Sequence, residues 1–178
     1  MEFLAEDELV DIVPSGTKEE IPFVERQFGR FRAAKESQVP LWLAIQLYKS
    51  KKWQIKPPAW LEVEWLSNKF NEENANEEDL TEMPPRYIEI SKILLHNARE
   101  VLQNADAVWT KLQDIQDIRQ CKIVKQLKAL RVERNEATVR FRHISKMELH
   151  GIRPFLLSVL NSFQKITDVK AQFEGRDE

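Results

Sequence analysis

Few residues of this chain have the type and spacing that catalysis or ligand binding requires. Loops that bind phosphate groups need clustered glycines, but the four glycines of this chain are scattered, so neither a Walker A nor a GxGxxG sequence can be assembled. The histidines, His96, His143 and His150, do not occur in an HExxH or comparable metal-binding spacing. The sequence therefore argues against nucleotide hydrolysis and against a metal site.

The remaining reactive groups have simpler interpretations. Cys121 is the only cysteine, so it cannot form an internal disulfide, and its position inside a predicted helix favours packing over nucleophilic chemistry. Adjacent glutamates at positions 19–20 and 77–78 lie in predicted linkers, which cannot hold a general acid and base in fixed geometry. We therefore predict that the chain is not an enzyme and binds no cofactor and no small-molecule substrate.

Basic residues recur every third position along one predicted helix. Each lies about 60° around the helix from the one before, so they do not form a strict stripe. A solvated helix face, contact with an acidic protein surface and contact with phosphate groups all remain open, although few aromatic residues lie between the bases to stack on single-stranded nucleic acid. This possible charged docking face consists of Lys122, Lys125, Lys128 and Arg131. The alternative function is a nucleic-acid-binding module that uses the basic helix from Lys122 to Arg142.

The overall composition is that of a folded protein. The 178 residues are 42% hydrophobic and 31% charged, and the net charge of -2 argues against wholesale binding to nucleic acid. The longest wholly apolar run, at residues 41–45, is far shorter than the roughly 20 residues of a membrane span. The N-terminus lacks the features of a secretory signal. We expect an intracellular protein with no membrane contact.

Prolines and glycines divide the predicted elements into two groups. Most prolines precede residue 86, whereas residues 86–150 contain neither proline nor glycine. Pro40 is predicted to open a helix that is apolar nearly all round and must therefore be buried. Short strands are predicted at residues 9–13, 21–24, 28–31 and 53–56.

The second group is predicted to form long amphipathic helices. Apolar residues recur every three or four positions from residue 87 until a stop near residue 104, and again in a helix at about residues 107–135. A capping-box sequence at residues 145–148 begins the last helix, which Gly151 and Pro154 should bend or restart.

These patterns predict a mainly α protein, with a small N-terminal β-rich (α+β) domain followed by a larger α-helical domain. The expected division is residues 1–58, residues 59–170 and a flexible tail at residues 171–178, with a helical pattern resuming near residue 60. The long helices carry more apolar stripe than the intervening sequence can cover, so a partner chain should cover part of it. The residues predicted to make subunit contacts are Trp109, Leu112, Ile115 and Ile118 on one helix and Leu156, Val159 and Phe163 on the last.

Several short fragments occur in an order and at spacings that are more specific together than any one of them alone. They are Glu2-Phe3-Leu4-Ala5-Glu6, Ile12-Val13-Pro14, Val39-Pro40-Leu41-Trp42-Leu43-Ala44-Ile45, Pro57-Pro58-Ala59-Trp60, Met83-Pro84 with Tyr87, Leu94-Leu95, Asp117-x-Arg119-x-x-Lys122 and Met147-Glu148-Leu149. Taken together, they resemble the Psf-two subunit family of the GINS complex of eukaryotic DNA replication. The resemblance spans about residues 2–165.

This resemblance implies a non-catalytic scaffold subunit. In that family a small β-rich domain precedes a helical domain, which packs against three sister subunits in a heterotetramer. The tetramer would join the Cdc-forty-five protein and the Mcm hexamer in the replicative DNA helicase, where the Mcm ring hydrolyses ATP, and would be needed for initiation and fork progression. The resemblance also implies a nuclear location and at most weak or indirect contact with DNA.

Overall fold

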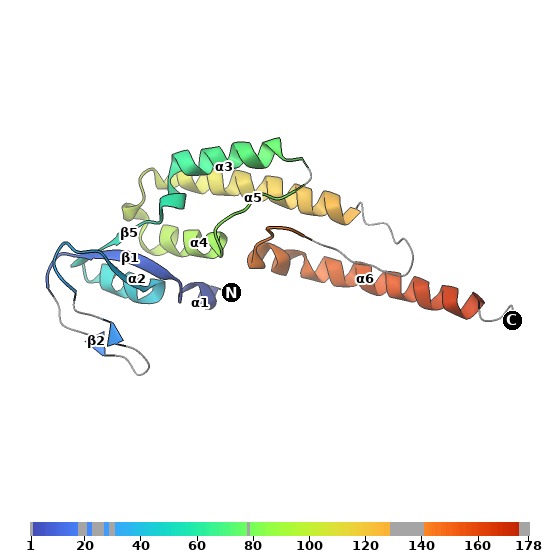
Figure 1. Cartoon of the computed structure of the whole chain (residues 1–178), viewed down its shortest axis with the longest axis horizontal. Coiled ribbons are helices and arrows are strands. Elements are labelled where there is room, and N and C mark those ends of the chain that lie inside the picture. Colours follow the sequence, from blue (N-terminus) through green and yellow to red (C-terminus); the bar gives the residue numbers. More distant parts are fainter. Residues whose placement is uncertain are drawn as a thin grey trace.

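The computed structural model describes residues 2–17, 21–22, 27–28, 31–77, 79–128 and 141–174. These residues form an elongated, mainly helical molecule with a small antiparallel sheet near one end, and the last helix projects from the other end (Figure 1). The fold class predicted from the sequence is confirmed. Within the described ranges, none of the helices combines the length and the apolar character that crossing a bilayer requires.

The larger sheet has β1 at its centre. β1 (Leu9–Pro14) pairs antiparallel with β4 (Ser37–Pro40) on one side and with β5 (Trp53–Lys56) on the other. Ile12 lies opposite Ile55, and both side chains are buried. Because side chains alternate between the two faces of a strand, this register gathers apolar residues on one face. The predicted strands β1 and β5 are confirmed, whereas β4 was not predicted.

A second ladder pairs two very short strands, β2 (Ile21–Pro22) and β3 (Gln27–Phe28). The sequence predicts short strands in this region, and they are confirmed for the described residues; several neighbouring residues lie outside the described ranges. Phe31 packs edge-on against Trp53, with ring centroids 4.8 Å apart. This contact fastens the segment before β4 to the three-stranded sheet.

α2 (Leu41–Lys49) packs against the sheet and is largely buried, as its nearly continuous apolar sequence predicts. Its first residue differs from the prediction. Pro40 is not the first helical residue but the last residue of β4, and it precedes the helix with an extended ψ of 146°. A proline that lacks an N–H is tolerated at either position, so the local sequence does not distinguish them. α1 (Glu2–Ala5) was not predicted.

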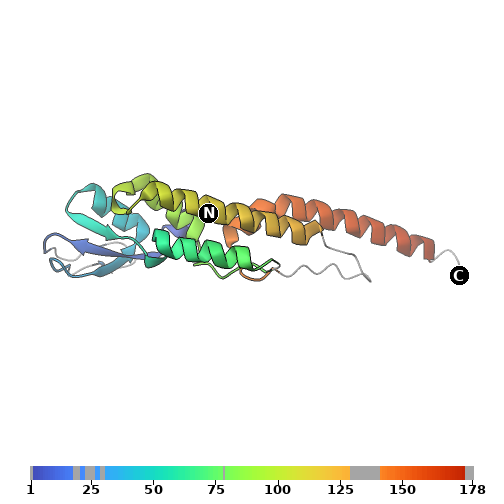
Figure 2. The ribbon, with the colours of Figure 1, turned by 90° about the horizontal axis from the view of Figure 1, so that it is seen from above.

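The helical part begins in the region where the sequence predicts a helix. η1 (Ala59–Leu61) and α3 (Val63–Ala75) are followed by α4 (Tyr87–Asn97), η2 (Arg99–Val101), α5 (Ala105–Lys128) and α6 (Lys146–Glu174). α3 and α5 lie side by side in both views, and α4 also contacts α5 (Figures 1 and 2). The α5 helix therefore forms the centre of the bundle.

Two helix boundaries differ from the sequence-based expectation. α4 ends at Asn97, because Ala98 leaves helical geometry at φ -142°, and a 3-10 turn replaces the last predicted turn. Asn104, which was predicted to close the same helix, adopts a left-handed φ of 55° directly before α5. The predicted end of α5 near residue 135 lies outside the described residues.

α6 is one continuous helix, although the sequence predicts a bend or restart at Gly151 and Pro154. The helix does not restart there. Pro154 removes one backbone hydrogen bond to the carbonyl of His150, but both residues are exposed, so water can hydrate that carbonyl. The helix also includes residues 171–174, which the sequence assigns to a tail; residues 175–178 lie outside the description.

One hydrophobic core runs through the sheet and the helices. The predicted division after residue 58 falls between β5 and η1, and core residues lie on both sides of it. Members of this core include Ile12 and Leu41 from the first part and Leu66, Tyr87 and Leu112 from the second. The β-rich part and the bundle therefore share their interior.

Candidate functional site

Arg119 of α5 is fully buried where α5 meets α6 and the loop before α4. Its Nε and Nη2 donate to the two carboxylate oxygens of Glu148 at 2.6 and 3.0 Å, and Nη2 also donates to the carbonyl of His143 at 2.7 Å. Nη1 donates to Glu73 Oε2 at 3.1 Å and to the carbonyl of Thr81 at 2.8 Å. All five donors of a guanidinium are thus used, which fixes its orientation as well as its charge.

Glu148 is held from several directions in the first turn of α6. The Ser145 N–H donates to Glu148 Oε2 at 2.8 Å and the Glu148 N–H donates to Ser145 Oγ at 3.2 Å, which confirms the predicted capping box. The Tyr87 hydroxyl donates to Glu148 Oε1 at 3.0 Å, and burial together with the Glu148 charge raises the pKa of Tyr87. Burial alone would raise the pKa of Glu148, but hydrogen bonds and charge from Arg119 outweigh it and lower this pKa. Glu148 is therefore ionised at neutral pH.

Glu73 in the last turn of α3 is a second buried carboxylate. Lys122 Nζ donates to Glu73 Oε1 at 2.6 Å and to the Glu73 carbonyl at 2.5 Å. The Thr81 N–H and hydroxyl donate to Glu73 Oε2 at 3.1 and 2.5 Å. Burial alone would raise the pKa of Glu73, but the hydrogen bonds from Lys122 and Thr81 and the charge of Arg119 lower it.

We call six residues the buried ionic cluster: Glu73, Thr81, Tyr87, Arg119, Lys122 and Glu148. Its two carboxylates and two cations balance in charge, the condition under which ionised groups can be buried. Its members come from α3, the loop before α4, α4, α5 and α6, so the cluster ties these elements together. Such an arrangement holds helices in place and leaves none of its ionised groups free for proton transfer. Across the described residues, no three His, Cys, Asp or Glu side chains are grouped to hold a metal ion.

The burial of Lys122 corrects the predicted charged docking face. Only 8% of Lys122 is exposed, because Glu73 holds its ammonium group, so it cannot present charge to a partner. Lys125 is exposed on the same helix, whereas the side chain of Lys128 and all of Arg131 lie outside the description. Lys122 is therefore not part of an exposed row of basic residues, and it is not available to bind nucleic acid either.

The predicted contact residues of α5 point in different directions. Leu112 and Ile115 are fully buried in the core of their own chain and are not available to another chain. The prediction is corrected here, because an apolar stripe shows that a helix face is buried but not which chain buries it. Ile118 is half-buried, and Trp109 is 42% exposed. Of the four, Trp109 offers the most surface to a partner.

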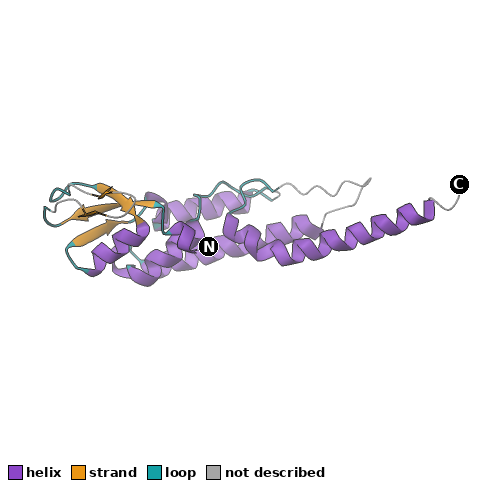
Figure 3. Ribbon diagram, turned by 90° about the horizontal axis from the view of Figure 1, so that it is seen from below, coloured by secondary structure: helices purple, strands orange, loops and turns teal. Residues whose placement is uncertain are grey.

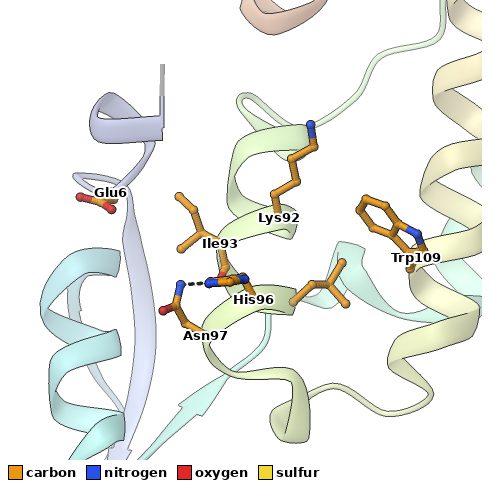
Figure 4. Close-up of a pocket in the computed structure, with 7 residues that line it drawn as sticks. Glu6, Lys92, Ile93, His96, Asn97 and Trp109 are labelled. Carbon is orange, nitrogen blue, oxygen red and sulfur yellow. Dashed lines mark hydrogen bonds between the residues drawn. The ribbon is translucent and has the colours of Figure 1, made fainter.

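Trp109 lines one side of an open groove that crosses α4 (Figure 4). Lys92, His96 and Asn97 line the α4 side of this groove, and Glu6, which follows α1, lies at its edge. The groove thus joins one large aromatic ring to several polar groups. Interfaces between proteins are commonly built from an aromatic anchor with polar residues around it.

A small apolar cluster packs α6 against α5. Leu80, Ile123 and Leu127 are its buried members, and Ile152 and Leu156 of α6 pack against them. Leu156, which was predicted to contact a partner, therefore contacts its own chain. The first part of the apolar stripe on α6 therefore packs against α5 of the same chain and not against a partner.

Other apolar residues of α6 remain at the surface. Leu149, Phe155 and Leu157 are 42%, 52% and 47% exposed. The sequence-based selection of contact residues left them out, although Leu149 begins the apolar stripe of this helix and Phe155 widens it. Val159 is half-buried, and the side chain of Phe163 lies outside the description. We call Leu149, Phe155 and Leu157 the exposed apolar residues of α6.

Two protein families match successive parts of the chain. Residues 1–56 match the PSF2 N-terminal domain, and residues 60–167 match the GINS complex protein helical bundle domain. This chain belongs to the PSF2 family of GINS proteins. The resemblance found in the sequence is therefore confirmed.

Relatives with the name DNA replication complex GINS protein PSF2 match almost the whole chain. The Homo sapiens relative is 35% identical, over 93% of this chain and 89% of the relative. The Schizosaccharomyces pombe relative is 33% identical, over 97% of this chain and 91% of the relative. The Candida albicans relative is 34% identical, over 93% of this chain and 80% of the relative. Each of these matches covers at least 93% of this chain.

The PSF2 resemblance singles out Arg119 and Glu148 as parts of matching fragments, but the sequence alone did not predict that they meet. A signal was present, because Ile115 lies three positions after Leu112 and Arg119 lies four positions after Ile115, so that Arg119 occupies a core position of the stripe. A charged residue at a core position indicates a buried partner. Glu73, which lies 46 residues away in the sequence, carries no comparable signal.

Proposed function

We propose that this chain is a non-catalytic scaffold subunit of a heterotetrameric GINS complex that contains three sister subunits. Membership of the PSF2 family supports a place in a DNA replication complex, because the names of its relatives contain these words. In this proposal the tetramer joins the Cdc-forty-five protein and the Mcm hexamer in the nucleus. The Mcm ring then hydrolyses ATP, and this chain contributes binding surfaces rather than chemistry.

The observation that carries the proposal is the presence of large apolar side chains at the surface, beside an ionic cluster that lies inside the chain. Glu73, Arg119, Lys122 and Glu148 are engaged with one another in the buried ionic cluster, whereas the buried Glu89 of α4 keeps one carboxylate oxygen without a hydrogen-bond partner among the described residues. Trp109 on α5 and Phe155 on α6 keep 42% and 52% of their surface exposed. Exposed aromatic residues of this kind are typical anchors of protein interfaces. We assign them to contacts with sister subunits.

Charge substitutions at both aromatic residues test this assignment. Trp109→Glu combined with Phe155→Glu would place carboxylates where an apolar partner surface is expected, and a buried unpaired carboxylate is costly. Recovery of the tetramer after co-expression with the sister subunits should fall at least about tenfold. The circular dichroism spectrum should stay that of the wild type, because both side chains are exposed.

Gln120→Glu provides the matched control. It adds one carboxylate, against the two of the double variant, at an exposed polar position of α5 and should leave the recovery of tetramer unchanged. If the double variant assembles as well as this control, the two aromatic residues do not make subunit contacts. If the wild-type chain forms no complex with sister GINS subunits, the proposed function itself is wrong.

A further inference from the structure

α6 leaves the body of the chain after a short stretch of contact. Its described contacts with other elements come from Met147, Glu148, Ile152 and Leu156, all within the first three turns. Beyond these turns the helix continues past the described end of α5 (Figures 1 and 3). Whatever fixes the direction of α6 among the described residues therefore acts within its first turns.

The apolar contacts restrain the direction of α6 less strictly. Hydrophobic attraction is itself non-directional, and Ile152 and Leu156, the α6 residues that pack against the small apolar cluster, are only partly buried. A guanidinium and a carboxylate, by contrast, must share a plane to form two parallel hydrogen bonds. Arg119 and Glu148 form two such bonds, at 2.6 and 3.0 Å. This pair is the directional contact between α5 and α6.

Both members of the pair are themselves held in place. The far side of the Arg119 guanidinium donates to Glu73 and to the carbonyl of Thr81, so the group cannot swing on α5. The carboxylate of Glu148 accepts from the Ser145 N–H and from the Tyr87 hydroxyl. A tilt of α6 would strain several of these bonds at once. The pair therefore fixes the orientation of α6 relative to α5.

We propose that Arg119 and Glu148 are positioning residues that set the direction of α6, so that its exposed apolar residues meet a sister subunit. The second half of this statement rests on the proposed function. From Glu148 to Glu174 the helix rises about 39 Å at about 1.5 Å per residue, so a tilt of about 10° would move its far end by about 7 Å. Side chains are in contact only within about 4 Å. The direction of α6 thus decides which of its contacts with a partner can form.

The direction of α6 can be measured in the full chain with two spin labels. Cys121, the only cysteine, is exposed on α5 and takes one label, and Ser158→Cys at an exposed position of α6 takes the other. In this labelled parent, double electron–electron resonance should give one narrow distance distribution. The native thiol makes the measurement possible with a single added cysteine.

Two substitutions break the pair in different ways. Glu148→Gln keeps the side-chain shape and can still accept the Ser145 N–H, but it removes the negative charge. Arg119→Lys keeps the positive charge but loses the planar fork. Each should widen the distance distribution at least about twofold, because either change releases the direction of the helix. The agreement of both variants would show that geometry, and not charge alone, is required.

The distance measurement needs a control variant and a check that each variant keeps its helix content. Arg153→Gln removes a positive charge from an exposed position of α6 outside the pair and should leave the distribution narrow. Circular dichroism identifies the variants that keep the parent's helix content, and one folded variant of either residue suffices. A narrow, unshifted distribution in such a variant would overturn the proposal.

Co-expression with the sister subunits separates the two halves of the proposal. A widened distribution together with at least about a fivefold loss of tetramer supports both halves, because a misdirected helix cannot place its contact residues. A widened distribution with full recovery of tetramer would overturn the link between the direction of α6 and assembly. If even the wild-type chain fails to assemble, the proposed function fails, but the distance measurement still decides whether the pair positions α6.

Discussion

Replacing Arg119 by methionine should remove much of the stability of the folded chain. Arg119→Met keeps a long unbranched side chain but deletes all five N–H donors of the guanidinium. The two buried carboxylates, Glu73 and Glu148, would then share Lys122 as the one remaining cation of the buried ionic cluster. The substitution therefore leaves negative charge buried without its partner.

The size of the effect follows from this burial. The side chains of Arg119 and Glu73 are 0% exposed and that of Glu148 is 9% exposed, so water cannot readily replace the lost cation. Removing one partner of a buried ion pair typically costs about 3–5 kcal/mol. Folded domains are typically stable by about 5–15 kcal/mol, so the loss would be a large part of the total.

Urea unfolding, followed by circular dichroism, measures the loss. With a urea dependence of about 2 kcal/mol per M, the midpoint should fall by about 1.5–2.5 M. Lys125→Met, which removes an exposed lysine of the same helix, should change the free energy of unfolding by no more than about 0.5 kcal/mol. The deficit of Arg119→Met should shrink toward about pH 3, because protonation neutralises the stranded carboxylates.

Two results would refute this reasoning. A loss below about 1 kcal/mol at neutral pH would show that Arg119 is not compensating buried charge. A larger loss that does not change with pH would show that the effect comes from packing. In either case the buried ionic cluster would need another explanation.

Two further predictions concern the wild-type fold and α6. The folded state lowers the pKa values of Glu73 and Glu148 from their ordinary 4.5, so it binds fewer protons than the unfolded state. The stability from these carboxylates should be complete above about pH 4.5 and be lost as the pH falls through the lowered values; urea midpoints that stay constant down to about pH 3 would contradict this. Gly151→Ala should stabilise the chain by about 0.5–1 kcal/mol, because glycine is costly inside a helix. The added Cβ meets no other atom within 4 Å, and a lower urea midpoint would count against the prediction.

The sequence predicts features whose causes are local. β1 is recognised by its β-branched and aliphatic residues and by the turn sequence that follows them. The capping box of α6 is recognised because all its atoms come from Ser145 to Glu148. Two predicted helix boundaries were wrong. α4 ends at Asn97 and not near residue 104, and Pro40 is the last residue of β4 and not the first residue of α2. These boundaries depend on how the chain packs in three dimensions, which sequence periodicity does not report.

The assignment of residues to contacts needed the structure. Leu112 lies on a stripe that the sequence identifies correctly as buried, but its own chain buries it. Lys122 lies in a run of bases that resembles a solvated face, but Glu73, 49 residues away in the sequence, draws it into the interior. Both errors have one cause, because periodicity shows which side of a helix is covered and not what covers it.

The interior that the sheet and the bundle share limits how PSF2 sequences can be recombined. The two family regions, residues 1–56 and 60–167, suggest modules that could be exchanged between species. Ile12 from one region and Leu66 from the other nevertheless belong to a single close-packed interior, where a change of one methylene group is felt. A chimaera with its halves from different organisms would join surfaces that were shaped by different neighbours. We therefore expect such a chimaera to be less stable than either parent unless the core residues of both regions are exchanged together.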